Sequence, residues 1–406
     1  MKLYDSIVIG AGAAGLFYGA LSEPGADSLI IDHSERPGLK LLLSGSGQCN
    51  ITHDGSIKDF ISRYGKNGRH IRGVLYGANN LSLIEFLSRN GIRTLTREDC
   101  KVFPESLKAS EILNMLISRA GANGFRLLLK QNITDIACND SDNTYTVKTG
   151  NSSFKTKKLI IATGGMSYPK TGSDGSIYPL IEKLGIPVIP AKPALVPIYT
   201  HNYAYKSLSG ISFKTAQVRL LENNREIAAI TGDLLLTHRA FSGPAVLDIS
   251  RYAQKGHELE INYIYPVSLR EASDMIKTDF QGNSRELHTY ISRIFKIPDA
   301  FASRVIEAAG ICPYMKTSCM EGDEIVKIAE ALTCHRYAVS GTGGFGEAMV
   351  TAGGVSLEGI NIRNMEAKNH SNLFFIGEVL DVDGDTGGFN LQFAYSSAAA
   401  AVRNKK

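Results

Sequence analysis

The chain has 406 residues, of which 43% are hydrophobic and 21% charged, and its formal net charge is +4. This length is enough for two or three domains with separate cores. Lys and Arg are spread along the chain without a long basic block, so we expect no nucleic-acid partner. The 6 cysteines include no CxxC pair, so we expect reduced thiols and neither a disulfide framework nor a metal site.

An apolar stretch follows the first residues, and a signal peptide is the alternative to a folded element there. Asp5 interrupts this stretch, and Gly10, Gly12 and Gly15 have the spacing of a phosphate-binding turn. We therefore expect the chain to fold from its first residues. No other segment approaches the roughly 18 consecutive apolar residues that span a bilayer, so we expect a cytoplasmic protein without a membrane partner.

These glycines lie between a short β-branched run, SIVI, and an amphipathic helical run. Gly10 permits a tight turn, Gly12 lets a pyrophosphate approach the backbone, and Gly15 lets the helix pack closely on the strand. A second strand, SLIID, ends at Asp32, where an acidic side chain accepts hydrogen bonds from an adenosine ribose. The pattern predicts a dinucleotide site; the alternative is that the glycines only allow close packing.

Two later segments favour FAD over NAD. Residues 157–165, KKLIIATGG, are typical of a strand that ends in a small-residue turn, and NITDIAC and TYTVKTG before them are typical of a hairpin. Residues 372–392 contain a strand, an acid, a glycine pair and the start of a helix. A flavin needs these parts, because its ribityl hydroxyls bind a carboxylate and its pyrimidine edge binds donors at a helix N-terminus.

The pattern between the flavin segments changes twice. Residues 191–265 are strand-like, with a hairpin over Asn223 and Asn224, and residues 267–334 contain successive helical runs. The predicted domains are an FAD-binding domain at 1–190 and 350–406, a β-rich inserted domain at 191–266 and 335–349, and a helical inserted domain at 267–334. We expect the insertions to lie over the flavin and to form a cleft with it.

Five segments carry a family resemblance: PGLKLLLSGSGQCNIT (37–52), ATGGMSYPKTGSDG (162–175), LTHRAFSGPAVLDIS (236–250), MVTAGGV (349–355) and GEVLDVDGDTGGFNLQFAYSS (377–397). In them the chain resembles the BaiN/YhiN-type bacterial flavoproteins, a group of NAD(P)/FAD-dependent and aminoacetone-oxidase-like oxidoreductases. The resemblance implies an α/β fold, with a Rossmann-like FAD-binding domain of the glutathione-reductase kind, an inserted β-rich domain and a small helical domain. More distantly, the chain is similar to the flavoprotein subunits of fumarate reductase and succinate dehydrogenase.

The resemblance also implies cofactor contacts: Glu378 to the ribitol and the main chain of Ile133 to the adenine. It implies contacts to the pyrimidine edge from Gly387, Gly388, Asn390 and Leu391, and to the pyrophosphate and isoalloxazine side from Ser44, Gly45, Gly47, Cys49 and Asn50. The predicted FAD-binding set is Gly10, Gly12, Ala13, Ala14, Gly15, Asp32, His33, Lys40, Ser44, Gly45, Gly47, Cys49, Asn50, Ile133, Ala162, Thr163, Gly164, Gly377, Glu378, Gly387, Gly388, Asn390 and Leu391. Two positions depart from the family. Gln48 replaces an arginine of SGGGRCN, which removes a positive charge near the cofactor, and Asp32 replaces a more usual glutamate.

Flavin performs the hydride chemistry, so the protein supplies position, electrostatics and a proton. His238 is the first catalytic candidate, because Ser242 as an N-cap and Pro244 in the first helical turn would hold its loop firmly. The alternative is a loop histidine bonded to the backbone.

Cys49 is the second catalytic candidate, as a thiol in a glycine-rich loop that could ionise near the flavin. The alternative is a small buried residue that fills space. Tyr168 and Arg239 are weaker candidates of the same kind.

A second glycine run, GTGGFG at 341–346, also fits GxGxxG, but a strand-like stretch follows it, so we expect no separate NAD(P)H domain. NADH or NADPH remains a transient electron donor.

We predict an NAD(P)H-linked, FAD-dependent oxidoreductase that transfers a hydride between flavin and a small or medium organic substrate, with reduction of a conjugated C=C bond as the reaction. An amine or alcohol oxidase that uses O₂ and a non-catalytic redox sensor are the alternatives, and the sequence leaves the oligomeric state open.

Overall fold

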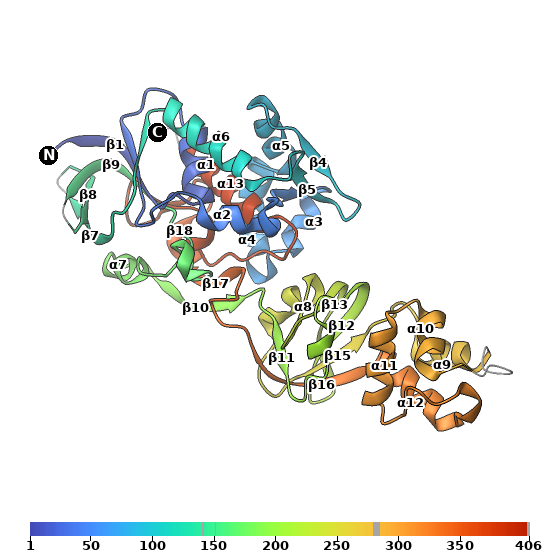
Figure 1. The fold of residues 1–406 in the computed structure, drawn as a ribbon. Helices are drawn as coiled ribbons and strands as arrows, with labels where there is room; N and C mark the ends of the chain where they lie inside the picture. The colour runs from blue at the N-terminus through green and yellow to red at the C-terminus, as the bar shows by residue number, and fades with distance from the viewer. Residues whose placement is uncertain (140–141, 151, 279–284, 404–406) are drawn as a thin grey trace. The chain divides into compact units, whose positions relative to one another are not determined.

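The structure is a computed structural model that describes residues 1–139, 142–150, 152–278 and 285–403. The chain divides into two compact units, Met1–Pro193 with Ala348–Lys406, and Ala194–Glu347. Each unit is described by itself, and Figure 1 follows both along the chain by colour.

The first unit is built on a parallel sheet with the order β20-β9-β1-β2-β6. Its strands are β1 (Leu3–Ile9), β2 (Ser28–Ile31), β6 (Phe125–Leu128), β9 (Ser153–Ile161) and β20 (Leu373–Phe375). Val8 pairs with Ile30 on one side and Ile160 on the other, and all three side chains are buried. Buried β-branched runs of this kind are typical of parallel sheets that are covered on both faces. The predicted α/β, Rossmann-like fold is confirmed.

Further strands extend this sheet. The predicted hairpin is confirmed as β7 (Ile133–Asn139) and β8 (Thr144–Thr149), which join β9, while β19 (Glu366–Ala367) and β18 (Ile360–Asn361) continue antiparallel from β20. Two small sheets lie apart from it: β3 (Thr52–His53), β5 (Lys101–Pro104) and β4 (Thr94–Thr96) in one, and β10 (Val188–Ala194) with β17 (Val350–Val355) in the other.

In this unit, helix α1 (Ala13–Leu21) packs against both α6 (Ala109–Ala122) and α13 (Phe389–Val402) (Figure 1). The Phe17 ring of α1 meets the Tyr395 ring of α13 edge to face, with centroids 5.4 Å apart. The remaining helices are α2 (Leu39–Leu43), α3 (Ile57–Ser62), α4 (Gly68–Gly77), α5 (Asn80–Arg89) and α7 (Tyr178–Lys183). The predicted C-terminal helix is thus confirmed as α13, and its Ala-rich end is buried.

The second unit contains a closed barrel with the order β11-β14-β13-β12-β15-β16. Its strands are β11 (Ile198–Thr200), β12 (Ser212–Glu222), β13 (Arg225–Leu236), β14 (Phe241–Ser242), β15 (Glu258–Asn262) and β16 (His335–Thr342). Asn223 and Asn224 both have positive φ, 50° and 63°, as a two-residue hairpin turn requires, which confirms the predicted hairpin. GTGGFG ends β16 and is followed by β17, a strand, as predicted.

The helices of the second unit are α8 (Pro244–Ile249), α9 (Leu269–Thr278), α10 (Leu287–Phe295), α11 (Asp299–Ala308) and α12 (Gly322–Thr333). The last four confirm the predicted helical runs and share one hydrophobic core with the barrel. The Tyr337 hydroxyl lies 2.6 Å from that of Tyr205 and 2.7 Å from that of Tyr263, all three rings being buried. Because barrel and helices share this core, the division of the insertion into β-rich and helical domains stays a prediction.

His288, on α10, lies between two carboxylates, 3.1 Å from Glu286 and 2.9 Å from Asp299. Partial burial lowers the pKa of His288, but its hydrogen bonds to the carboxylates of Glu286 and Asp299 outweigh burial and raise that pKa above the ordinary value.

Within the described part of the chain, no helix is long and apolar enough to span a bilayer.

Candidate functional site

The glycine turn between β1 and α1 has the geometry that the sequence predicts. Gly10 has a φ of +109°, and a Cβ there would lie 2.3 Å from the carbonyl oxygen of Ala162 on the neighbouring strand. A Cβ on Gly15 would lie 2.0 Å from the carbonyl oxygen of Gly10. Gly12, in contrast, has nothing within 4 Å of its Cβ position. Two glycines therefore allow close packing, and the third leaves open space at the start of α1.

This open space adjoins the positive end of a helix. Helix α1 starts at Ala13 with no acidic residue in its first turn and no side chain that caps it. The first N–H groups of a helix lack intrahelical partners and carry a partial positive charge. The turn therefore offers donors and room to an anionic group such as a pyrophosphate.

Asp32, at the end of β2, is held against the same turn. One carboxylate oxygen accepts a hydrogen bond from the Ala11 N–H at 2.6 Å, and the other accepts one from the Ser34 N–H at 2.7 Å. Each oxygen of an ionised carboxylate has a second lone pair, so Asp32 can also accept a ribose hydroxyl.

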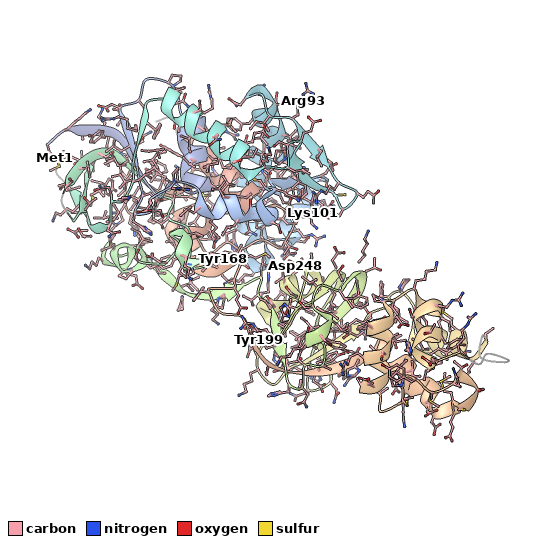
Figure 2. The ribbon with its side chains drawn as sticks, viewed as in Figure 1. Met1, Arg93, Lys101, Tyr168, Tyr199 and Asp248 are labelled. Carbon is pink, nitrogen blue, oxygen red and sulfur yellow. The ribbon has the colours of Figure 1, made fainter. Side chains whose placement is uncertain are left out.

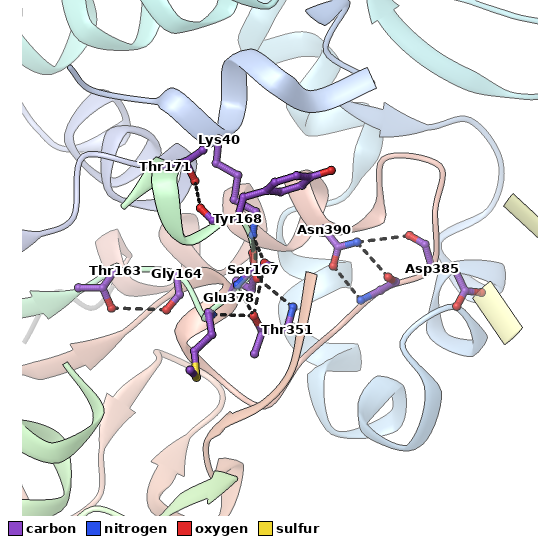
Figure 3. Close-up of polar contacts among 12 residues, drawn as sticks. Lys40, Thr163, Gly164, Ser167, Tyr168, Thr171, Thr351, Glu378, Asp385 and Asn390 are labelled. Atoms are coloured by element: carbon purple, nitrogen blue, oxygen red, sulfur yellow. Dashed lines mark hydrogen bonds and ion pairs between the residues drawn. The ribbon is translucent and has the colours of Figure 1, made fainter. Parts of the chain in front are cut away.

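Glu378 is the centre of a polar network drawn from separated segments (Figure 3). Its carboxylate accepts hydrogen bonds from Lys40 Nζ at 2.6 Å, Ser167 Oγ at 2.7 Å and the Thr351 N–H at 2.9 Å. The Glu378 and Lys40 side chains are only 18% and 26% exposed, so their charges balance each other away from bulk water. The sequence predicted both residues as cofactor contacts but did not predict their ion pair.

The turn after β9 lies beside this network and contains an unsatisfied polar atom. Ser173 Oγ is buried and has no hydrogen-bond partner among the described residues, and it would lie 2.8 Å from a Cβ on Gly164. Tyr168 has a φ of +51°, which is unusual for a bulky residue, and Figure 3 shows its ring beside Lys40. A buried hydroxyl without a partner and an open glycine cradle both fit a polar cofactor in this region.

The glycine pair before α13 is equally constrained. Gly387 and Gly388 have φ values of +115° and +95°, and a Cβ on Gly388 would lie 2.5 Å from the carbonyl oxygen of Thr52. The Asn390 side chain accepts from the Gly384 N–H at 2.8 Å and donates to the Gly384 carbonyl at 2.9 Å, which fixes the preceding loop (Figure 3). When the Asn50 side-chain amide is oriented so that its nitrogen and its oxygen both have hydrogen-bond partners, the oxygen accepts from the Gly388 N–H at 3.1 Å. No side chain caps α13, so the main-chain N–H groups of its first turn, after Gly388, are available to a ligand.

His53 is a candidate that the sequence analysis missed. Its ring stacks on Phe389 with centroids 5.2 Å apart, and it would lie 3.4 Å from a Cβ on Gly387. His53 Nδ1 contacts the Asp54 carbonyl at 2.5 Å, which leaves Nε2 for another partner. The available signal was its position directly after the segment 37–52, which carries the resemblance.

Cys49 does not have the environment of a reactive thiolate. Its side chain is fully buried, and burial raises the pKa of the thiol to about 11. This shift opposes ionisation of the thiol, and the catalytic role of Cys49 stays a prediction. The alternative, a small residue that fills space, agrees with this burial.

Gln48 lies beside a positive charge from another element. Arg97 donates from Nη2 to Gln48 Oε1 at 2.6 Å, and its guanidinium lies 4.0 Å from the centroid of the Phe103 ring. The Phe103 ring in turn would touch a Cβ on Gly45 at 3.2 Å.

His238 and Arg239 belong to the second unit, so their catalytic roles stay predictions. His238 is exposed in the turn after β13. Ser242 belongs to β14 and the N-cap of α8 is Gly243, so the predicted capping by Ser242 is wrong, whereas Pro244 does begin the helix. Arg239 pairs with Glu347 at 2.8 Å, and the Tyr199 hydroxyl donates to Glu347 at 2.6 Å; Figure 2 labels Tyr199.

All residues of the predicted FAD-binding set, from the glycine turn to α13, lie in the first unit. Their contacts to the cofactor stay predictions, but the open cradle at Gly12, the unpaired Ser173 hydroxyl and the free start of α13 fit FAD.

Comparisons with known proteins identify the family and support the fold of the chain. The HI0933-like protein Rossmann domain matches residues 4–404. Ribosomal RNA dihydrouridine synthase of Escherichia coli is 30% identical, over 100% of this chain and 98% of its own length, and the protein of that name from Haemophilus influenzae is 32% identical, over 98% and 97%. The 3-dehydro-bile acid delta(4,6)-reductase of Clostridium scindens is 25% identical, over 98% and 97%.

Among solved structures, 3-ketosteroid-delta4-(5alpha)-dehydrogenase of Rhodococcus jostii shares the fold, with a TM-score of 0.53 at 13% identity over 99% of this chain and 97% of that one. The match of the family over nearly the whole chain and the agreement in fold lead to one assignment. This chain belongs to the HI0933-like family of FAD-dependent oxidoreductases.

Proposed function

We propose that this protein reduces the C5=C6 double bond of uridine in ribosomal RNA to give dihydrouridine, with FAD as cofactor and NADH or NADPH as donor. One observation carries the proposal: the two relatives named ribosomal RNA dihydrouridine synthase are 30% and 32% identical across almost the full length of both chains. The C5=C6 bond of uracil is conjugated to the C4 carbonyl. It therefore belongs to the class of conjugated C=C bonds that the sequence predicted as the reducible group.

The chemistry balances without a further reactant. Uridine, NAD(P)H and one proton give dihydrouridine and NAD(P)⁺, with the hydride added at C6 and the proton at C5. When bound, FAD supplies the hydride chemistry. The residues of this chain orient the reactants, stabilise charge and deliver the proton.

The contacts on the chain suggest how that work is divided. Glu378, fixed by Lys40, Ser167 and Thr351, would hold the ribityl hydroxyls. The start of α13 would stabilise negative charge on the pyrimidine edge. His53 would donate the proton at C5 from Nε2, because its ring is held against Phe389 beside the glycine pair.

The RNA substrate contrasts with our expectation that the evenly spread charge makes nucleic acid an unsuitable partner. A second candidate, reduction of an enone in a small molecule, is favoured by the 25% identical bile acid reductase. Both candidates use the same redox chemistry and differ in what binds beside the flavin.

The test starts with an anaerobic titration of the purified holoprotein with NADH and NADPH, followed by the loss of visible absorbance of oxidised flavin. The reduced protein is then mixed with ribosomal RNA from a strain that lacks it, and dihydrouridine is measured by mass spectrometry of nucleosides. Dihydrouridine formation supports the proposal. Reoxidation by a 3-oxo-Δ4 steroid without any action on RNA would favour the small-molecule reductase, and reoxidation by O₂ alone would favour an oxidase.

His53→Gln tests the proton donor in the same assay. Reduction of the flavin by NAD(P)H is expected to be unchanged, whereas the rate of dihydrouridine formation is expected to fall by about 10²- to 10⁴-fold, the usual contribution of a general acid. An unchanged rate would remove His53 from this role.

A further inference from the structure

We propose that the exposed face of helix α4 is an RNA-binding surface, in which Arg69 and Arg72 contact phosphates and Tyr76 stacks on a base. This surface, called here the α4 surface, consists of those three side chains. The inference rests on the proposed function, because it assigns the part of the chain that would hold the RNA.

The chain is locally basic around α4 although its overall charge is small. From Phe60 to Ile84 it contains no Asp or Glu, but it has Lys or Arg at positions 63, 66, 69 and 72 and a histidine at position 70. These residues are not consecutive, so the sequence shows no basic block. Helical spacing is what brings some of them together.

Helix α4 has two distinct faces. Ile71, Val74 and Leu75 are buried against the first unit. Arg69, Arg72 and Tyr76 follow one another at intervals of three and four residues, so they share the opposite face. All three are exposed, and 52% of Tyr76 is accessible to solvent.

The cations of this face are not used inside the protein. Lys66 and Arg63, nearby, pair with Asp381 at 3.1 Å and with Asp385 at 3.7 Å. Arg69 and Arg72 have no such carboxylate partner among the described residues. They can therefore bind external anions without breaking an internal ion pair.

Residues 63–67, directly before helix α4, are tied to the chain on both sides of the flavin glycine pair. The Tyr64 hydroxyl donates to the Phe389 carbonyl at 2.8 Å, the Asp385 N–H donates to the Arg63 carbonyl at 2.8 Å, and Asn67 donates to the Asp381 carbonyl at 2.5 Å. In Figure 1, α4 lies beside α13 in the same unit. RNA held on the α4 surface would thus lie close to the region where the flavin is expected.

The chemistry of the surface favours RNA over other anionic partners. Arginines contact phosphates, and an exposed aromatic ring between or beside them provides a platform for a base. A membrane would be bound by cations together with several large apolar side chains on one face, and the exposed face of α4 offers the ring of Tyr76 alone.

The experiment compares three holoproteins: wild type, Arg69→Gln/Arg72→Gln, and the control Arg93→Gln/Arg119→Gln. Arg93 (labelled in Figure 2) and Arg119 are exposed arginines of the same unit that lie outside α4 and outside the predicted flavin contacts. Binding of a fluorescein-labelled, uridine-containing hairpin RNA is measured by anisotropy at several salt concentrations. Flavin content and dihydrouridine formation are measured on the same preparations.

The logarithm of the RNA association constant falls linearly with log[salt], and each lost phosphate contact makes this slope less steep by about 0.7–0.9. Two lost contacts therefore weaken binding by about 25- to 60-fold at 0.1 M salt. We expect this loss in the α4 variant at unchanged flavin content, and near-wild-type binding in the control. Tyr76→Ala is expected to weaken binding with no change in slope, because stacking releases no counterions.

Equal binding by the α4 variant and the control would overturn the proposal, and so would tight binding to phosphatidylserine vesicles without binding to RNA. The test also separates this proposal from the proposed function. Dihydrouridine formation that is insensitive to both arginines contradicts the α4 surface and leaves the function standing. RNA binding that depends on both arginines without any dihydrouridine contradicts the function and leaves the surface standing.

Discussion

Replacement of Gly12 by alanine separates cofactor binding from protein folding. The Cβ position of Gly12 has nothing within 4 Å, and its φ of −81° suits alanine. Alanine restricts the unfolded chain, which stabilises the folded protein, but it is a poorer N-cap than glycine, which destabilises it. We therefore expect the stability of the apoprotein to change by less than about 1 kcal/mol. In the holoprotein, the new methyl group would stand where the pyrophosphate approaches. An overpacking cost of about 1–3 kcal/mol raises the Kd of FAD about 5- to 150-fold.

Gly15→Ala is the matched control, one turn further along the same helix. Its Cβ would lie 2.0 Å from the Gly10 carbonyl oxygen and 3.0 Å from Val8 Cγ1, so the strand and helix must separate. We expect this variant to lose at least about 1–3 kcal/mol of stability even without FAD. Urea unfolding of the apoproteins and fluorescence titration with FAD measure both quantities. Wild-type FAD affinity in a folded Gly12→Ala protein would show that the pyrophosphate does not approach this turn.

Three further predictions concern charge, pH and buried hydroxyls. Glu378→Gln leaves Lys40 without its carboxylate partner. Because the two side chains keep some exposure, 18% and 26%, we expect the free energy of unfolding to fall by about 1–3 kcal/mol, less than for a fully buried pair. Urea unfolding measures this loss, and the double variant Lys40→Met/Glu378→Gln should recover part of it. The raised pKa of His288 means that its contribution to stability is complete below its ordinary pKa and is lost as pH rises through its folded pKa. The melting temperature of wild type minus that of His288→Gln should therefore fall as pH rises above the ordinary histidine pKa of about 6.5, and a constant difference would contradict this assignment. Tyr337→Phe removes the hydroxyl that is hydrogen-bonded to two other buried tyrosines, and we expect calorimetry to show that the free energy of unfolding falls by about 1–3 kcal/mol. An unchanged unfolding transition would mean that the two remaining hydroxyls find other partners.

Local patterns were sufficient to predict most elements of the fold. The glycine turn, the hairpin over Asn223 and Asn224 and the four helical runs each depend on residues that are close in sequence, and the structure confirms them. The predicted capping by Ser242 failed because Gly243, with a φ of +87°, makes the turn itself, and Ser242 is paired in β14.

The candidate site was less predictable because its contacts join distant segments. Glu378 and Lys40 were both expected near the cofactor, but no local pattern indicates a bond across 338 residues. His53 was missed for the same reason, since its significance comes from Phe389, which stacks on it from the far end of the chain. The burial of Cys49, which raises the pKa of its thiol, is likewise a property of tertiary packing and not of its glycine-rich neighbours.

The position of Gln48 shows how tertiary structure changes the interpretation of a single residue. The sequence indicates a lost positive charge, because the family usually has arginine there. In the structure Arg97 reaches the same place from the turn between β4 and β5, bonded to Gln48 at 2.6 Å and stacked 4.0 Å from the Phe103 centroid. Gln48 can accept this bond, whereas an arginine at position 48 would repel Arg97. The glutamine and the arginine therefore act as a pair, and the positive charge beside this loop is kept by a residue 49 positions away.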